Sequence, residues 1–372
     1  MDVEVRFATT EDEREAVYRL RYATYVEEMH VYTRQADHER RWFQDAEDAT
    51  AHLMYAKVGE EVVGTLRVHL EAEGAIPESI ASRFALERFR PLVSAEQLCV
   101  VGRFMVRQDM RGTAVPYRLI QESIRFQLSR GQELAFCDCQ PHLLNLYLSL
   151  GFRPYLGPYD HPEFGVMVPL VLVLKDREHL EWVGSPLTSL LSSDAAGSEV
   201  PERVAPLLAK ARGVMSQELS DPDSYWREVH GLMGTARPAV FSGLSEQELQ
   251  AVLASSHVLQ CAPGDYLIRK GQVARTVFVV LSGTLEVRDG ERAVATAQEG
   301  EVLGEVAFLL STSRISDVCA SGNGARVLAL SEKSLRALID SSSRAAALLL
   351  LNLSRALAHK LVQRADSPKS GG

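Results

Sequence analysis

The sequence has 372 residues, a formal net charge of −9, 46% hydrophobic residues and 24% charged residues. This composition is typical of a soluble globular chain with two or three domains. The negative charge argues against a broad polyphosphate-binding surface, without excluding a local basic patch. Because no run approaches the roughly 20 apolar residues that a membrane span needs, we expect no membrane span.

The cysteine pattern indicates the compartment. The five cysteines are odd in number and scattered, which fits reduced thiols in a cytoplasm better than a disulfide framework. Cys137 and Cys139 alternate along an apolar run, so we expect them to pack within a strand. We expect no metal, because a metal site needs more ligands at a recognisable spacing.

The first half of the chain alternates strand-like and helix-like patterns. Strands are predicted over 3–8, 51–58, 61–70, 98–106, 134–139 and 166–174, and helices over 11–22, 114–129 and 142–150. A tight turn at Gly59-Glu60 joins the second and third strands. This order predicts an α/β domain over residues 1–182.

One stretch of this half carries a specific motif. Asn145-Leu146-Tyr147-Leu148-Ser149-Leu150-Gly151-Phe152 is a short helix with a Tyr-x-x-x-Gly-Phe ending. Together with the order of the elements, it resembles the closing helix of the GNAT acyltransferase superfamily. The resemblance implies that Tyr147 is a general acid, which protonates the departing thiolate. The alternative is that Tyr147 only packs the helix against the sheet.

The phosphate loop of that superfamily is matched only in part. Arg111 and Gly112 stand where the resemblance places residues that bind the phosphates of the acyl donor. Ala114 and Pro116 stand where glycine is preferred, and proline removes one amide from the loop. We therefore expect only weak binding of coenzyme A by this loop.

Four further stretches resemble a subgroup, the autoinducer synthases and N-acyl amino acid synthases; they are 19–29, 45–53, 64–67 and 102–104. The resemblance implies an acyl donor carried on acyl carrier protein or CoA. It also implies that Asp45 and Asp48 orient or deprotonate the acceptor amine, while Arg67 and Arg103 hold the charges of the site. Val100 replaces a glutamate of the autoinducer synthases, which favours another amine as acceptor. A solvated acidic loop is the alternative for the aspartates.

The second half begins with a looser segment, 183–240, which predicts a linker with two short helices over 201–215 and 222–233. A capping box at Ser245-Glu246-Gln247-Glu248 then opens an amphipathic helix. Short strands are predicted over 257–261, 266–269, 277–280, 284–287 and 293–297, and helices over 332–339 and 343–363. Regularly spaced short strands predict an antiparallel β-roll, here over 241–365, followed by a polar tail over 366–372.

Within the predicted roll lies Gly304-Glu305-Val306-Ala307, followed by Arg314-Ile315-Ser316. This pattern resembles the cyclic-nucleotide-binding family. The resemblance implies that backbone amides and Arg314 bind the cyclic phosphate, and that Glu305 accepts the ribose 2′-hydroxyl proton. Ile315 occupies a position where cGMP-selective members often have a hydroxyl, which favours cAMP, while Ser316 leaves cGMP open. The alternative is a roll that has lost its ligand.

The two resemblances predict an N-acyltransferase regulated by a cyclic nucleotide, and the cysteine pattern predicts that it is cytoplasmic. A catalytically silent binding module that acts as a nucleotide-dependent scaffold, and a protein lysine acetyltransferase, remain as alternatives. We expect no DNA binding, because a helix-turn-helix would have to follow the last predicted helix, and only the seven-residue polar tail follows the predicted roll. That helix is apolar around most of its circumference, from Leu348 to Leu361, so we expect it to contact either the acyltransferase domain or a second copy of the chain, and we favour the homodimer.

Overall fold

The structure, a computed structural model, describes residues 2–74, 76–191, 198–208, 213–219, 222–233, 237–272, 275–310 and 312–366. It divides the chain into two compact units that are interleaved along the sequence. The first comprises Met1–Cys139, Leu146–Tyr155 and Pro169–Ala211, and the second comprises Gln140–Asn145, Leu156–Val168 and Arg212–Gly372. Helix α4 (Leu144–Ser149) and strand β8 (Gly165–Val173) therefore contribute residues to both units.

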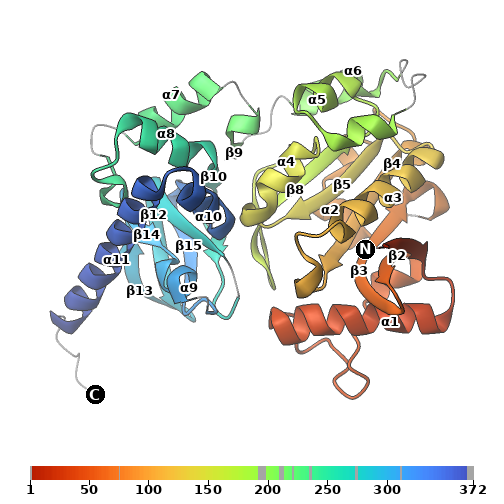
Figure 1. The fold of residues 1–372 in the computed structure, drawn as a ribbon, viewed down its shortest axis with the longest axis horizontal. Coiled ribbons are helices and arrows are strands. Elements are labelled where there is room, and N and C mark those ends of the chain that lie inside the picture. Colours follow the sequence, from red (N-terminus) through yellow and green to blue (C-terminus); the bar gives the residue numbers. More distant parts are fainter. Residues whose placement is uncertain are drawn as a thin grey trace. The chain divides into compact units, whose positions relative to one another are not determined.

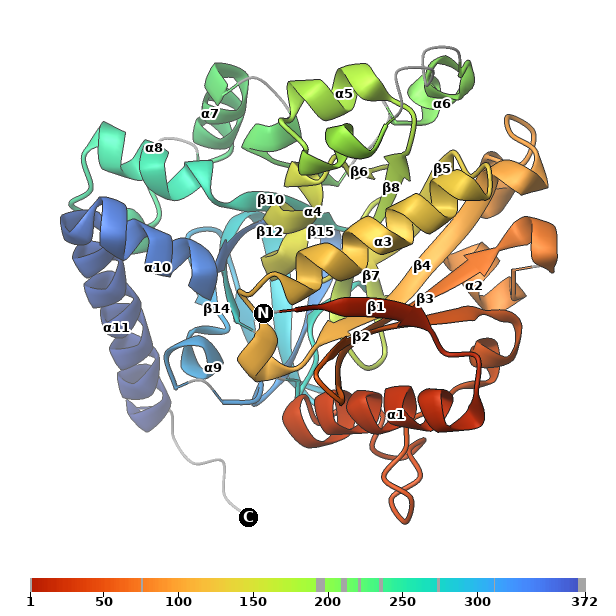
Figure 2. The same ribbon diagram turned by 45° about the vertical axis from the view of Figure 1, so that its right-hand side comes forward.

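A mixed sheet in the order β1-β2-β3-β4-β5-β8-β6 forms the centre of the first unit (Figures 1 and 2). The strands in this order are β1 (Glu4–Phe7), β2 (His52–Val58), β3 (Glu61–Leu70), β4 (Leu98–Val106), β5 (Leu134–Cys139), β8 and β6 (Arg153–Pro154), and β7 (Tyr159–His161) pairs with β8 outside this order. The pairs from β1 to β4 are antiparallel, whereas β4 and β5 are parallel. The predicted α/β arrangement is confirmed, and the strand bounds agree with the sequence pattern to within a residue.

Two helices of the first unit pack on this sheet. Helix α1 (Glu11–Arg21) contacts β2 and β3, and helix α3 (Val115–Ser129) contacts β1 to β4 (Figure 2). A capping box of Thr10 and Glu13 starts α1, and a π-helical segment, Tyr22–Glu28, follows it directly. Short π-helical segments occur frequently at functional sites, because they redirect side chains within a helix.

Strand β4 is interrupted by a bulge in its middle. Thr65 of β3 pairs with Met105, but Arg67 pairs with Gly102, so two residues of β4 face one residue of β3. Arg103, one of these two, has a φ of 54°, which is unusual for a residue with a side chain. Within the described chain, β4 pairs with β5 only over Leu98–Val100, so the two strands separate before the bulge.

An antiparallel sheet in the order β13-β12-β15-β10-β9 forms the second unit, with β11 on β15 and β14 on β12. The strands are β9 (Val214–Met215), β10 (His257–Cys261), β11 (Tyr266–Ile268), β12 (Thr276–Asp289), β13 (Arg292–Ala297), β14 (Val302–Leu303) and β15 (Asp317–Ser331). The predicted β-roll is confirmed.

Two predictions for the second half are wrong in detail. The strands expected at 277–280 and 284–287 are one strand, β12, which shifts register near Gly283 rather than turning there. A Cβ at Gly283 would lie 2.2 Å from the carbonyl oxygen of Gly324 in β15, so glycine permits close approach of two strands. Of the helix expected over 201–215, the structure has α6 (Val200–Leu208); residues 209–212 lie outside the described residues, and Val214–Met215 pairs with β10 instead of being helical.

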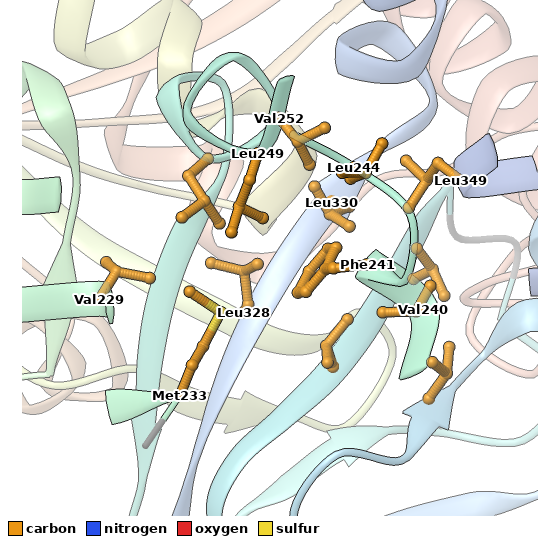
Figure 3. Close-up of a cluster of buried hydrophobic side chains, with 14 of the residues drawn as sticks. Val229, Met233, Val240, Phe241, Leu244, Leu249, Val252, Leu328, Leu330 and Leu349 are labelled. Atoms are coloured by element: carbon orange, nitrogen blue, oxygen red, sulfur yellow. The ribbon is translucent and has the colours of Figure 1, made fainter. Parts of the chain in front are cut away.

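Helices cover a large apolar core of the second unit (Figure 3). They are α7 (Pro222–Leu232), α8 (Glu246–Ala254), α10 (Glu332–Ser341) and α11 (Ser343–Asp366). Phe241, Leu249 and Leu328 are fully buried in this core. The predicted capping box is confirmed, because the Ser245 side chain accepts from the amide of Glu248, whose own carboxylate accepts from the amide of Ser245.

Helix α11 combines buried and exposed apolar surface. Ala345, Leu349 and Leu353 are buried in the core, whereas Leu351 and Leu361 are exposed. By length and composition alone, the stretch Ser343–Val362 has the properties of a membrane span, and 28% of it is buried. The core helix of a soluble protein has the same length and composition.

The loop Leu156–Val168, which contains β7 (Tyr159–His161), packs against the roll inside the second unit. Asp160 forms an ion pair with Arg269, and the Gln272 side chain donates to the carbonyl of Glu163 at 2.8 Å. A Cβ at Gly165 would lie 2.6 Å from Gln272 Oε1, so this contact has no room for a side chain at that position.

Candidate functional site

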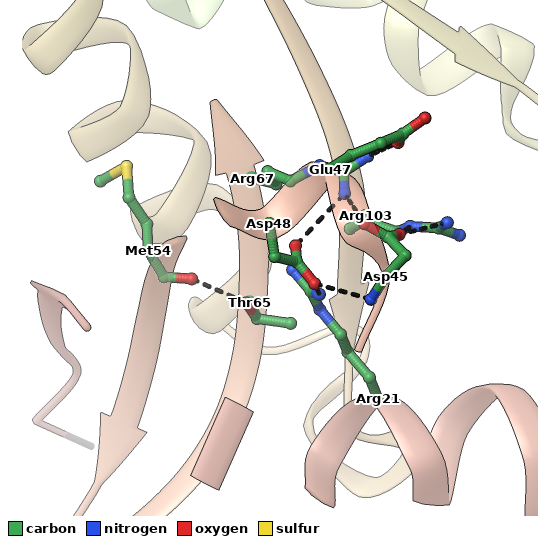
Figure 4. Close-up of polar contacts among 8 residues, drawn as sticks. All are labelled: Arg21, Asp45, Glu47, Asp48, Met54, Thr65, Arg67 and Arg103. Atoms are coloured by element: carbon green, nitrogen blue, oxygen red, sulfur yellow. Dashed lines mark hydrogen bonds and ion pairs between the residues drawn. The ribbon is translucent and has the colours of Figure 1, made fainter. Parts of the chain in front are cut away.

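A cluster of charged side chains lies beside the bulge of β4 (Figure 4). Asp45 and Asp48 stand at the start of a 3-10 turn (Ala46–Thr50), where the amide of Asp45 donates to Asp48 Oδ2 at 3.0 Å. Arg67 of β3 forms ion pairs with Asp45, with Glu47 and, at 3.2 Å, with Asp48. Arg103 binds Asp45 through Nε at 2.9 Å and Nη2 at 2.6 Å. The four residues named from sequence thus meet in one place.

Asp45 is the centre of this cluster because it bridges two arginines. Burial would raise the pKa of the Asp45 carboxyl, but the charges of Arg103, Arg67 and Arg21 outweigh burial and lower it. Asp45 is therefore a carboxylate at neutral pH and a weak base. Its geometry is better suited to orienting a cation than to removing a proton from an amine.

Sequence reasoning missed a third arginine of the cluster. Arg21 of α1 is fully buried and donates to Asp48 Oδ2 at 2.7 Å. Its Nε and Nη2 atoms have no hydrogen-bond partner among the described residues. The sequence does contain a signal for this residue, since Arg21 lies on the same face of α1 as Val17 and Leu20. A charged residue on such an apolar face is seldom buried without a partner, so a partner could have been expected.

Aromatic rings enclose Arg103. Its guanidinium carbon lies 4.8 Å from the ring centre of Tyr32, 5.2 Å from Phe43 and 5.5 Å from Tyr25. Burial raises the pKa of Tyr32 to about 12, so this phenol is neutral beside the cation. The rings and Asp45 together restrain Arg103 in its uncommon backbone conformation.

We expect Asp45→Asn to lower the free energy of unfolding by about 2–4 kcal/mol, because it leaves two enclosed arginines without their shared carboxylate. Since folding lowers the pKa of Asp45, this stabilisation is present above about pH 4 and is lost on acidification. Urea denaturation measures the difference. Asp109→Asn is the control, because its pair with Arg107 is exposed and worth about 0–1 kcal/mol. Equal losses in both variants would contradict the central role of Asp45.

Tyr147 lies on α4 and is partly buried, with its ring 5.3 Å from that of Phe152. Burial raises the pKa of its phenol well above the ordinary value. Cys137 makes a smaller contribution in the same direction, and Tyr25 a still smaller one. Tyr25 also contacts Arg103, so one ring beside the charged cluster is close enough to Tyr147 to interact with it electrostatically. A phenol with a raised pKa retains its proton at neutral pH, as a general acid requires.

In the predicted phosphate loop, the arginine that would bind a phosphate is already paired with a carboxylate of the chain. Arg111 pairs with Glu28 through two bonds of 2.5 and 2.7 Å, and its Nε donates to the carbonyl of Val106. Gly112 is exposed with a φ of 83°. Ala114 precedes α3 without a side-chain cap. A donor phosphate would have to displace Glu28 from Arg111.

The second candidate site joins β14 and helix α9 (Glu305–Leu310) in the roll. Arg314 is 4% exposed; its Nη1 donates to the carbonyl of Gly304 at 2.8 Å and its Nη2 to that of Thr276 at 2.5 Å. Burial lowers the pKa of Arg314 to about 10, while the negative charge of Glu305 opposes this shift. Gly304 has a φ of 80°, and a Cβ there would lie 2.1 Å from Arg314 Nη1.

The other residues named from the motif differ in exposure. Glu305 and Ala307 are buried, Val306 and Ser316 are partly buried, and Ile315 is 53% exposed. Lys360 of α11 reaches the Glu305 carboxylate. Glu305 and Arg314 are thus close enough to interact electrostatically, but each has a partner within the chain.

Comparisons with known proteins match each half separately. The family model of the N-acyl amino acid synthase FeeM matches residues 16–175, and that of the cyclic nucleotide-binding domain matches residues 258–342. A cyclic nucleotide-gated channel of Caenorhabditis elegans is 33% identical over 87 residues, which are 22% of this chain and 11% of the channel. The chain thus spans about a tenth of that relative's length.

Two solved structures are similar to one half each. FeeM, an N-acyl amino acid synthase from uncultured soil microbes, has 17% identity and a TM-score of 0.38, over 51% of this chain and 99% of that one. A cyclic nucleotide-binding domain from Methylobacillus flagellatus has 17% identity and a TM-score of 0.36, over 43% of this chain and 91% of that one.

The fold and the matches define a chain that joins a GNAT-type acyltransferase domain to a cyclic nucleotide-binding roll. More particularly, the N-terminal domain is of the FeeM N-acyl amino acid synthase family, and the C-terminal domain is a cyclic nucleotide-binding domain.

Proposed function

We propose that the chain transfers an acyl group from a thioester to the amine of a small molecule such as an amino acid, and that a cyclic nucleotide regulates this transfer. The observation that carries the proposal is the charged cluster at the β4 bulge, where Asp45 bridges Arg67 and Arg103. An amino acid has a cation and a carboxylate, and this cluster has both complementary charges within a few ångströms.

The chemistry follows from the bulge and from Tyr147. Backbone amides at Arg103 and Phe104 lie outside regular pairing with β3, which supports a role as donors to the oxyanion. The neutral amine attacks the thioester carbonyl carbon and a tetrahedral oxyanion forms. As the C–S bond breaks, Tyr147 donates its phenolic proton to the departing sulfur, and the proton that the attacking nitrogen loses to water returns through water to the Tyr147 phenolate.

The donor is proposed to be an acyl group on acyl carrier protein rather than on CoA. The pairing of Arg111 with Glu28, together with Ala114 and Pro116 in the loop, supports this choice because a nucleotide phosphate would find few free donors there. Strands β4 and β5 separate beyond Val100, which leaves main-chain groups available to an extended thioester arm.

The proposed regulator is cAMP, with cGMP as the alternative. Arg314 supplies the cation for the cyclic phosphate, and Glu305 supplies an acceptor for the ribose 2′-hydroxyl. Both side chains are buried and near each other, which supports a retained ligand site. Ile315 is exposed, so its direct contribution to base selection is small, and only a binding measurement separates the two nucleotides.

Release of free thiol tests the enzymatic proposal. Long-chain acyl carrier protein and acyl-CoA are offered with a panel of amino acids, with and without saturating cAMP. We expect thiol release that depends on the amino acid, is faster with the carrier protein, and changes with cAMP. No release from any donor under either condition would support the catalytically silent binding module.

A homodimer through α11 is proposed as well, from the exposed Leu351, Leu361 and Val362. We expect Leu351→Ser with Leu361→Ser to halve the mass measured by sedimentation equilibrium, because polar groups weaken an apolar contact. Leu349 is buried in the core and is left unchanged. A wild-type chain that sediments as a monomer would contradict the dimer.

The free, buried thiols support the proposed cytoplasmic location.

A further inference from the structure

A lysine near the end of α11 forms an ion pair with the carboxylate that is expected to bind ribose. Lys360 Nζ donates to Glu305 Oε1 at 3.0 Å and to the carbonyl oxygen of Val302 at 2.5 Å. The Glu305 side chain is 6% exposed and that of Lys360 is 31% exposed. Val302 precedes Gly304 and Glu305 follows it, so one ammonium group ties α11 to both sides of the phosphate-binding turn.

We propose that Lys360 is a latch, which holds the cyclic-nucleotide site closed until the ribose of the nucleotide displaces it from Glu305. This inference rests on the proposed function, because it assumes that Glu305 and Arg314 bind the nucleotide. The ribose hydroxyl and the ammonium compete for one carboxylate, and the hydroxyl forms the weaker, neutral-donor bond. Lys360 can leave because its partly exposed side chain regains water on release.

The state of Arg314 supports a closed site. Nη1 and Nη2 each donate to a carbonyl oxygen, of Gly304 and of Thr276, so the chain itself holds both ends of the guanidinium fork, while the buried Nε has no partner among the described residues. The cavity that Arg314 lines together with Phe278 and Gln272 measures about 20 Å³. Small-molecule sites have volumes of about 300–1,000 Å³. Nucleotide binding therefore requires this region to open, and breaking the contact of α11 with the turn is one step of opening.

The latch makes α11 responsive to the ligand. Helices α11 and α9 are in contact, and Lys360 contributes the ion pair to this contact. When Glu305 binds ribose, the end of α11 loses that ion pair and its bond to Val302. The signal that nucleotide is bound thus reaches α11 through one side chain, without any change in the buried first half of the helix.

Calorimetry with the full chain tests the latch directly. We expect Lys360→Met to bind cAMP about tenfold more tightly than the wild type, because ribose no longer competes with a charge-assisted hydrogen bond. Lys360→Gln retains a neutral donor and should also tighten binding, by less. Lys360→Arg retains the cation and should remain near the wild type. Lys333→Met removes an exposed lysine from α10 and serves as the matched control.

A second measurement needs no nucleotide. In the ligand-free chain, Lys360→Met should increase the hydrogen exchange of amides in the last turns of α11, up to Val362, whereas Lys333→Met should not. This readout also shows whether the variant folds, since the amides of β12 should remain protected.

The outcomes separate the latch from the function on which it rests. If the wild type binds cAMP or cGMP and Lys360→Met binds it with the same affinity, the latch is overturned but the proposed nucleotide site is not. Weaker binding in Lys360→Met would also overturn it, since Lys360 would then contact the nucleotide itself. A wild-type chain that binds neither nucleotide would overturn the proposed regulation, and the latch with it.

Discussion

Arg314→Ala is expected to weaken cyclic-nucleotide binding by a factor of about 30 to 5,000, or about 2–5 kcal/mol. The phosphate would lose its charge-assisted partner in a region from which most water is excluded. The same variant leaves the carbonyls of Gly304 and Thr276 without their donor, so a modest loss of stability should accompany it. Calorimetry with cAMP, below the unfolding temperature of each variant, measures the effect.

Two companion variants sharpen this experiment. Arg336→Ala removes an exposed arginine on α10, and should not change affinity. Glu305→Ala should weaken binding and reduce the preference for cAMP over its 2′-deoxy analogue, because the hydroxyl has lost its acceptor. Micromolar binding that survives Arg314→Ala unchanged would place the nucleotide elsewhere in the roll.

Tyr147→Phe is expected to reduce the rate of acyl transfer by about 10²–10⁴, because it removes the proposed acid for the departing thiolate and little volume. The fold should survive, since the ring contact with Phe152 is retained. Because burial raises the pKa of Tyr147, the wild-type rate should not fall through loss of this proton below about pH 10. Thiol release at saturating donor measures the rate.

The control for this variant is Tyr117→Phe, which removes a phenol on α3 that donates to the carbonyl of Pro186. Its rate should remain near that of the wild type. A Tyr147→Phe rate within threefold of wild type would assign Tyr147 to packing, the alternative that the sequence leaves open. The size of the rate loss therefore decides between acid catalysis and packing.

The elements of this fold were predictable because their signals are local. Strands Leu98–Val106 and Leu134–Cys139 have the predicted bounds, and the box that caps α8 was visible in four consecutive residues. Alternation along a strand and the period of 3.6 along a helix are properties of neighbouring residues. The error at β12 has the same origin: Ser282-Gly283 has the composition of a turn, but only the partner strand β15 reveals a bulge.

The candidate sites were predictable as residue types but not as contacts. Asp45, Asp48, Arg67 and Arg103 could be named from sequence, whereas the bond of Arg21 to Asp48 spans 27 positions. Arg314 donates to Thr276 across 38 positions, and Lys360 reaches Glu305 across 55. These pairings depend on the path of the chain through both sheets and on burial, which strengthens contacts between charges that water would otherwise screen. Only the tertiary structure brings such side chains together, because no local pattern specifies which distant residue will be the partner.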